Sequence, residues 1–281
     1  MNKERIGTGI MCIAPMFLLW GIQLLTARGY ILFKKLIYIF STKNATPEDI
    51  ALFEGSVPNE PGFSMNVLLI YIFISLAVEI IIYFIWMKRP VDTIKNMTVI
   101  SFFAIPLMFF ALEIVISVDM GIISAIFPWM LNGYEELIDN MGVNDFSTVS
   151  TIVTIVGAPI VEELAFRGII MTNLNKLIKK FYIVNIIQAF LFGFMHLNLF
   201  QSTYAFLAAL FLGYIAYRYK SVYASIIAHA AFNFTGTYFV TWLAKEDASL
   251  PMRMLGSFNV SVLILGLVYI LFRYEDKKRN G

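Results

Sequence analysis

One stretch of the chain, residues 151–171, reads TIVTIVGAPIVEELAFRGIIM. It is apolar enough to cross a bilayer, yet Glu162, Glu163 and Arg167 lie inside it. An ionised group at the centre of a bilayer costs about 2.5–3.5 kcal/mol on insertion scales. These three residues therefore need polar partners elsewhere in the chain, and they predict a functional site. Pro159 is expected to kink the helix just before the glutamates and so admit water or substrate.

The composition is that of a membrane protein. Of 281 residues, 59% are hydrophobic and 14% are charged, whereas soluble domains have about 45–50% apolar and about 25% charged residues. The basic residues form short clusters between apolar runs, which argues against a nucleic-acid partner. A single cysteine, Cys12, excludes an internal disulfide and a cysteine-rich metal site. It also makes a cysteine protease an unfavoured interpretation.

The apolar runs predict an all-α bundle of about eight transmembrane helices, because each run is close to the roughly 20 residues that a spanning helix needs. We treat residues 1–281 as one integral membrane domain. The predicted spans are 6–25, 65–87, 97–118, 148–180, 182–199, 203–217, 222–243 and 258–272. Residues 28–40 are expected to lie along the membrane interface, and residues 42–63 and 134–144 to form polar loops. Residues 121–131 are apolar but too short to cross.

The positive-inside rule predicts the orientation in the cell membrane. With eight spans, five basic clusters fall on one side, at residues 1–5, 88–95, 176–180, 218–220 and 273–279. The acidic segments 42–63 and 119–147 fall on the other side. Both termini are therefore expected in the cytoplasm. Arg28, Lys34 and Lys35 do not follow this pattern.

Candidate partners for the glutamates come from the two histidines of the chain. His196 is expected inside the fifth span and His229 inside the seventh. Asn233 follows His229 by four residues, so the two side chains share one helix face. At about 1.5 Å per helical residue, Glu162, His196, His229 and Asn233 all fall near the middle of the bilayer. These four side chains can therefore converge.

The order of these motifs resembles that of a known family. Glu-Glu-x-x-x-Arg at 162–167, Phe-x-x-x-His at 192–196 and His-x-x-x-Asn at 229–233 look like the motifs of the CAAX protease and bacteriocin-processing family. The resemblance covers about residues 150–243, with a motif-bearing core at about 148–243. It implies an intramembrane endopeptidase that needs no cofactor and acts on a peptide or protein in or at the lipid bilayer.

The resemblance also implies roles for single residues. Glu162 would be the general base and His196 would help it to activate a water molecule. His229 and Asn233 would donate hydrogen bonds to the oxyanion. Glu163 and Arg167 are spaced for an ion pair on one helix face, which would hold the site, and Glu163 is a second candidate for water activation. A general base and an oxyanion site in a water-poor environment are what peptide hydrolysis requires.

Three alternatives stay open. Zinc bound by Glu162, His196 and His229 would also support hydrolysis, although no carboxylate is expected to orient either imidazole. A non-proteolytic membrane protein for bacteriocin immunity, or a scaffold for a membrane-protein partner, would retain the same motifs. The polar site residues could also have a purely structural role, in which they only hold the helices together. Glu79 and Glu113 also lie in spans, and we expect them in helix packing or in a cavity.

Overall fold

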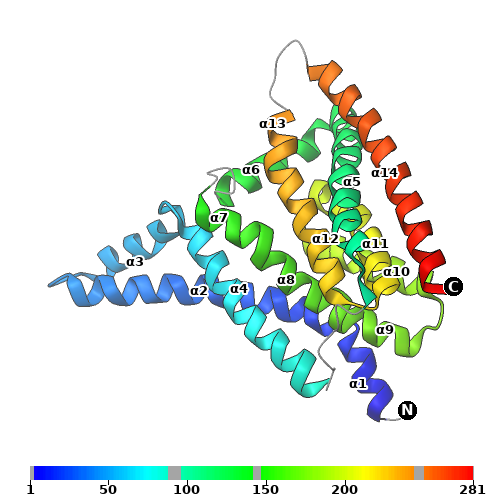
Figure 1. The fold of residues 1–281 in the computed structure, drawn as a ribbon. Helices are drawn as coiled ribbons and strands as arrows, with labels where there is room; N and C mark the ends of the chain where they lie inside the picture. The colour runs from blue at the N-terminus through cyan, green and yellow to red at the C-terminus, as the bar shows by residue number, and fades with distance from the viewer. Residues whose placement is uncertain (1–2, 88–95, 142–146, 244–249, 281) are drawn as a thin grey trace.

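The structure is a computed structural model that describes residues 3–87, 96–141, 147–243 and 250–280. Throughout these ranges the regular elements are helices, and no strand occurs among them. Figure 1 shows their arrangement. The helices are α1 (Lys3–Met11), α2 (Ala14–Ser41), α3 (Pro47–Ser56), η1 (Val57–Asn59), α4 (Phe63–Ile80), η2 (Ile81–Trp86), α5 (Val99–Ile126), α6 (Pro128–Met141), α7 (Thr148–Ile152), η5 (Val153–Gly157), α8 (Ala158–Glu163), η6 (Leu164–Ile170), α9 (Met171–Leu177), α10 (Phe181–Met195), α11 (Leu199–Tyr219), α12 (Val222–Phe234), η7 (Thr235–Val240), α13 (Thr241–Leu243) and α14 (Leu250–Asn280).

Six helical segments of the described chain are long and apolar enough to cross a membrane. They are Ala14–Ser41, Phe63–Ile85, Val99–Ile126, Thr148–Leu177, Leu199–Tyr219 and Met252–Lys278. Helix α10 is apolar but shorter, and α12, η7 and α13 together form the remaining predicted span. The expected all-α polytopic membrane bundle is confirmed. The chain is therefore a multi-pass membrane protein.

The predicted first span is wrong in its bounds. The chain does not form one helix over residues 6–25, because α1 ends at Met11 and α2 begins at Ala14. Pro15 lies in the first turn of α2, where no backbone N–H is needed. In the interior of one continuous helix the same proline would remove a hydrogen bond, so a new helix begins here. Helix α2 then runs without interruption through the segment that was expected to lie along the interface.

The segment predicted as a polar loop at 42–63 contains helix α3. Its capping box explains the start of the helix: the Thr46 side chain accepts from the Asp49 N–H, and the Asp49 carboxylate accepts from the Thr46 N–H. The Thr46 hydroxyl also donates to the Asp49 carboxylate, at 2.7 Å. This bond first, and the one from the Thr46 N–H second, hold the pKa of Asp49 below its usual value. The expected loop at 134–144 is likewise helical up to Met141, because Pro128 begins α6.

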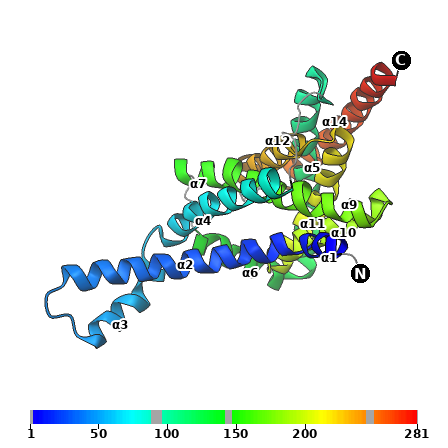
Figure 2. The same ribbon diagram turned by 90° about the horizontal axis from the view of Figure 1, so that it is seen from below.

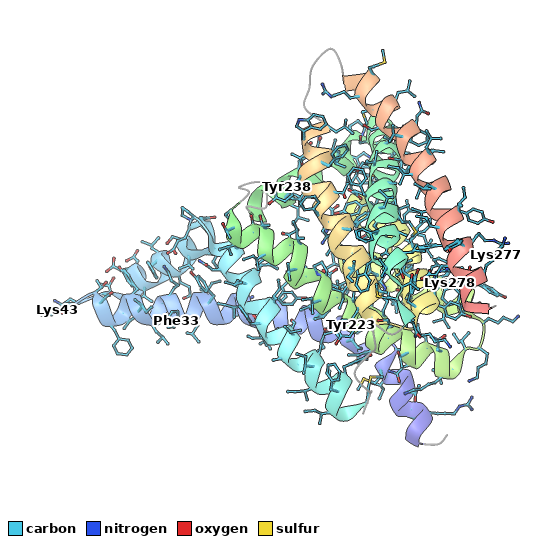
Figure 3. All side chains as sticks on the ribbon, viewed as in Figure 1. Phe33, Lys43, Tyr223, Tyr238, Lys277 and Lys278 are labelled. Atoms are coloured by element: carbon cyan, nitrogen blue, oxygen red, sulfur yellow. The ribbon has the colours of Figure 1, made fainter. Side chains whose placement is uncertain are left out.

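Helices α2 and α3 project away from the bundle, as Figures 1 and 2 both show. In Figure 3 Lys43 marks the tip of this projection, and Phe33 points outward from α2. Here Lys34 pairs with Glu60 at 2.8 Å and Lys35 pairs with Glu54 at 2.7 Å. The two lysines that departed from the positive-inside pattern are therefore neutralised by acids of the next segment.

The two largest hydrophobic cores of the described bundle meet at the fourth predicted span. One core joins α5, α11, α12 and α14, which lie together in Figure 1. The other joins α2 and α4 to α8, η6, α9 and α10. The segment from α8 to η6 contacts α4, α10 and α12. Its polar residues are therefore surrounded by helices rather than facing lipid.

A buried carboxylate fastens α14 to the bundle. Glu275, whose side chain is 1% exposed, accepts from Thr98 Oγ1 at 2.7 Å, Ser101 Oγ at 2.9 Å and Tyr219 OH at 2.8 Å. Arg218 Nη2 lies 3.3 Å from its second oxygen. Thr98 and Ser101 lie at the start of α5, and Arg218 and Tyr219 lie at the end of α11. The Glu275 carboxylate therefore joins α14 to α5 and α11 at one end of the bundle.

Candidate active site

The two adjacent glutamates lie in different environments. The Glu163 side chain is fully buried, whereas that of Glu162 is 16% exposed. Glu163 Oε1 accepts from Arg167 Nη1 at 2.7 Å, so the predicted ion pair is present. It also lies 2.9 Å from His229 Nδ1. Glu163 is therefore committed to holding its neighbours, and Glu162 is the carboxylate that a water molecule or substrate can reach.

His229 on α12 lies between the two glutamates. Its Nδ1 contacts Glu163, and its Nε2 lies 3.8 Å from Glu162 Oε2. With Nδ1–H donating to the Glu163 carboxylate, the ring is fixed with Nε2 directed to Glu162. The expectation that no carboxylate orients an imidazole was therefore wrong. It failed because the distance between residues 163 and 229 depends on how α12 packs on α8.

Phe192 on α10 packs against both imidazoles and the guanidinium. Its ring centroid lies 5.4 Å from that of His196 and 5.8 Å from that of His229, both edge to face. The Arg167 guanidinium lies over the same ring at 4.6 Å, a favourable cation–π geometry. The phenylalanine of the second motif thus brings the histidines and Arg167 to one place.

His196 lies at the end of a helix, not inside one as expected. Helix α10 ends at Met195, and Leu197 has a left-handed φ of 55°. The Asn198 side chain accepts from the Gln201 N–H and so begins α11. The His196 ring is half-buried, and no hydrogen bond joins it to another residue of the described ranges. Its ring nitrogens are therefore available to a water molecule or a substrate.

Asn233 satisfies a carbonyl that Pro159 leaves without a donor. In the π-helical turn η5, the Ala158 N–H reaches back five residues to the Val153 carbonyl. The next bond of this register would run from residue 159 to the Thr154 carbonyl, but proline has no N–H. Asn233 Nδ2 donates to that carbonyl at 2.9 Å. The structure therefore shows a π-helical turn next to Pro159, and such turns often occur at functional sites.

Comparison with protein families gives a match to this part of the chain. Residues 144–235 match the family described as Type II CAAX prenyl endopeptidase Rce1-like. Residues 144–235 are similar to this family, and we refer to them as the Rce1-like segment. The match confirms the resemblance noted from the motifs, and it includes every predicted site residue from Glu162 to Asn233. Comparison with curated proteins and comparison with solved structures each gave no match.

Two buried amides of α10 that sequence reasoning missed help to position Arg167. Gln188 Nε2 donates to the Asn185 side chain at 2.8 Å and to the Ala209 carbonyl at 3.0 Å. Arg167 Nη2 donates to the same carbonyl at 3.2 Å. The guanidinium is therefore held from two sides, by Glu163 and by α11. Two amides three residues apart in an apolar helix were the only signal in the sequence.

The alternative zinc set does not fit the geometry of the Rce1-like segment. In the part of the chain that the structure describes, no three His, Cys, Asp or Glu side chains are placed to hold a metal ion. Glu162 and His229 approach to 3.8 Å, but the ring of Phe192 lies between His196 and His229.

Proposed function

We propose that this chain is an intramembrane endopeptidase that hydrolyses a peptide bond in a membrane-associated or lipidated protein or peptide. The observation that carries the proposal is the pair of adjacent glutamates. Glu163 is buried and holds Arg167 and His229, while Glu162 is left accessible beside the same histidine. A structural ion pair between Glu163 and Arg167 alone would not require a second carboxylate inside the bundle.

In the proposed reaction, Glu162 takes a proton from a water molecule as the water oxygen attacks the scissile carbonyl. His196 is the second group that orients this water, since its ring has no partner elsewhere among the described residues. A buried carboxylate with few hydrogen bonds is a stronger base than one in water. The reaction as proposed uses no metal ion.

The oxyanion that forms on the carbonyl would receive hydrogen bonds from His229 and Asn233. Asn233 has two amide hydrogens and uses one for the Thr154 carbonyl, so the other is free to donate. His229 donates Nδ1–H to Glu163 and can donate from Nε2 only as the imidazolium. The geometry thus supports the two donors unequally: Asn233 can act in its ordinary state, whereas His229 must first gain a proton.

We further propose that both termini face the cytoplasm. The N-terminus, α9 and the C-terminal end of α14 lie at the same side of the molecule in both views (Figures 1 and 2). The basic residues Lys176, Arg218 and Lys277 belong to these ends. Residues 88–95, part of the same argument, lie outside the described residues.

The test is cleavage by purified protein in detergent. The probes are an internally quenched peptide with a farnesylated cysteine four residues from its C-terminus and the same peptide without the lipid. Wild type and His196→Ala are compared, each with and without 1,10-phenanthroline. We expect wild-type cleavage that the chelator leaves intact and that His196→Ala reduces about 10²-fold or more. Chelator-sensitive cleavage restored by zinc would refute the metal-free reaction.

A non-proteolytic role makes a different prediction. If Glu162→Ala accumulates in the membrane and fully supports the cellular function of the protein, the endopeptidase proposal is wrong.

A further inference from the structure

Glu79 on α4 is a buried carboxyl group that the reaction above does not use. Its side chain is 1% exposed, and neither oxygen has a hydrogen-bond partner within the described parts of the chain. Burying a polar group without a partner costs several kcal/mol. Glu275 is equally buried, but four donors surround it. A role in helix packing alone therefore does not explain Glu79.

The packing of α4 places Glu79 level with the glutamate pair. A Cβ on Gly157 would meet Ile72 Cδ1 at 2.8 Å, and one on Gly168 would meet the Tyr83 ring at 3.0 Å. Both contacts join residues 85 positions apart, so the two segments run parallel and in constant register. Glu79 then lies level with residue 164, only about 3 Å along the axis from Glu162 at 1.5 Å per residue.

The side chain also faces the fourth span. Ile72, Ser75, Glu79, Ile82 and Tyr83 are the buried positions of this part of α4 and η2. Glu79 is three or four residues from Ser75, Ile82 and Tyr83, so these positions define one helix face. Two members of that face touch the fourth span directly. Glu79 and Tyr71 are both close enough to Glu162 for electrostatic interaction. The free oxygens of Glu79 are therefore directed to the site rather than to lipid.

Peptide hydrolysis needs a second proton transfer, to the leaving nitrogen, and this proton comes either from the protonated base or from a second acid. Water loses a proton as its oxygen bonds to the carbonyl carbon. The C–N bond then breaks with its electron pair on nitrogen, and this nitrogen must take up a proton to leave as an amine. General acid catalysis of such a step contributes about 10²–10⁴-fold.

We propose that Glu79 is a further catalytic residue, the acid that protonates the leaving nitrogen while Glu162 takes the proton from water. The Glu79 carboxyl group gives its proton to the nitrogen as the C–N bond breaks and becomes a carboxylate. The proton held by Glu162 then passes to Glu79, which restores both groups and consumes one water molecule in all. This inference rests on the endopeptidase function proposed above.

The test compares two versions of one peptide, with an amide or a thioester at the scissile bond. A thiolate leaves without a proton, because thiols ionise near a pKa of about 8.5. Glu79→Gln should lower kcat about 10²–10⁴-fold on the amide and change it less than about threefold on the thioester. Glu162→Gln should slow both reactions. Glu113→Gln is the matched control, since Glu113 is a buried carboxyl group on α5, and both its rates should equal those of wild type.

Two outcomes overturn the assignment of Glu79 alone. Glu79→Gln could cleave the amide at the wild-type rate, or it could lose both reactions equally with a lowered unfolding midpoint, which would make Glu79 structural. In either case wild type cleaves and Glu162→Gln does not, so the endopeptidase function stands. If wild type cleaves neither substrate, the proposed function and this inference are refuted together.

Discussion

The ion pair between Glu163 and Arg167 should dominate the stability of the site. Both side chains are fully buried and the Nη1–Oε1 distance is 2.7 Å. Arg167→Met keeps the length of the side chain and removes its charge, leaving Glu163 as a buried carboxylate with one partner. Breaking a buried pair in this way costs about 3–5 kcal/mol, which lowers the ratio of folded to unfolded protein about 10²–10⁴-fold.

The assay is equilibrium unfolding in mixed micelles titrated with a denaturing detergent, followed by circular dichroism. The double variant Glu163→Gln, Arg167→Met should be more stable than Arg167→Met by at least about 1 kcal/mol, because the uncompensated charge is gone. Lys34→Met is the control, since its pair with Glu60 has both side chains about one-third exposed and should contribute less than about 1 kcal/mol. Arg167→Met within 1 kcal/mol of wild type would refute the reasoning.

Three further predictions concern the supports of the site, and each is read as a change in the free energy of unfolding in the same assay. Asn233→Leu should cost about 1–3 kcal/mol by leaving the Thr154 carbonyl unsatisfied, and less in a Pro159→Ala background that restores a backbone N–H; equal costs would contradict the assignment. Gly213→Ala should destabilise by at least about 1 kcal/mol, because a Cβ there would overlap Asn185 Oδ1, whereas Gly21→Ala, with open space around it, should be neutral or stabilising. Glu275→Ala should cost about 3 kcal/mol or more and leave the rate of cleavage per folded molecule unchanged; a lost rate in folded protein would tie that end of the bundle to the reaction.

Local spacing predicted what lies on a single helix. The pair Glu163 and Arg167 follows from the distance of four residues, which fixes two side chains on one face whatever surrounds them. His229 and Asn233 both face the fourth span for the same reason. These parts of the site depend on geometry within one segment, so the sequence was sufficient.

Contacts between helices were not predictable in the same way. That His229 turns Nδ1 to Glu163, or that Phe192 lies against Arg167, depends on crossing angles and rotations that no local pattern specifies. The bond from Asn233 to the Thr154 carbonyl depends on a π-helical register that only the packed structure reveals. The break between α1 and α2 was missed because residues 6–25 were treated as one apolar run. Pro15 lies within that run, in the first turn of α2.

Glu79 shows a different limit. It stands outside every motif, and only the register between α4 and the fourth span places it beside Glu162. An isolated carboxyl group in an apolar run predicts that the residue has a function or a polar partner. It does not predict which function or which partner.

The central claim is that the adjacent glutamates have separate roles, Glu162 in the reaction and Glu163 in holding the site. The most direct measurement is kcat and the unfolding free energy of Glu162→Gln and Glu163→Gln, made on the same preparations with the farnesylated peptide. We predict that Glu162→Gln loses about 10²–10⁴-fold in kcat at wild-type stability, whereas Glu163→Gln is destabilised. Cleavage at the wild-type rate by folded Glu162→Gln would contradict the account.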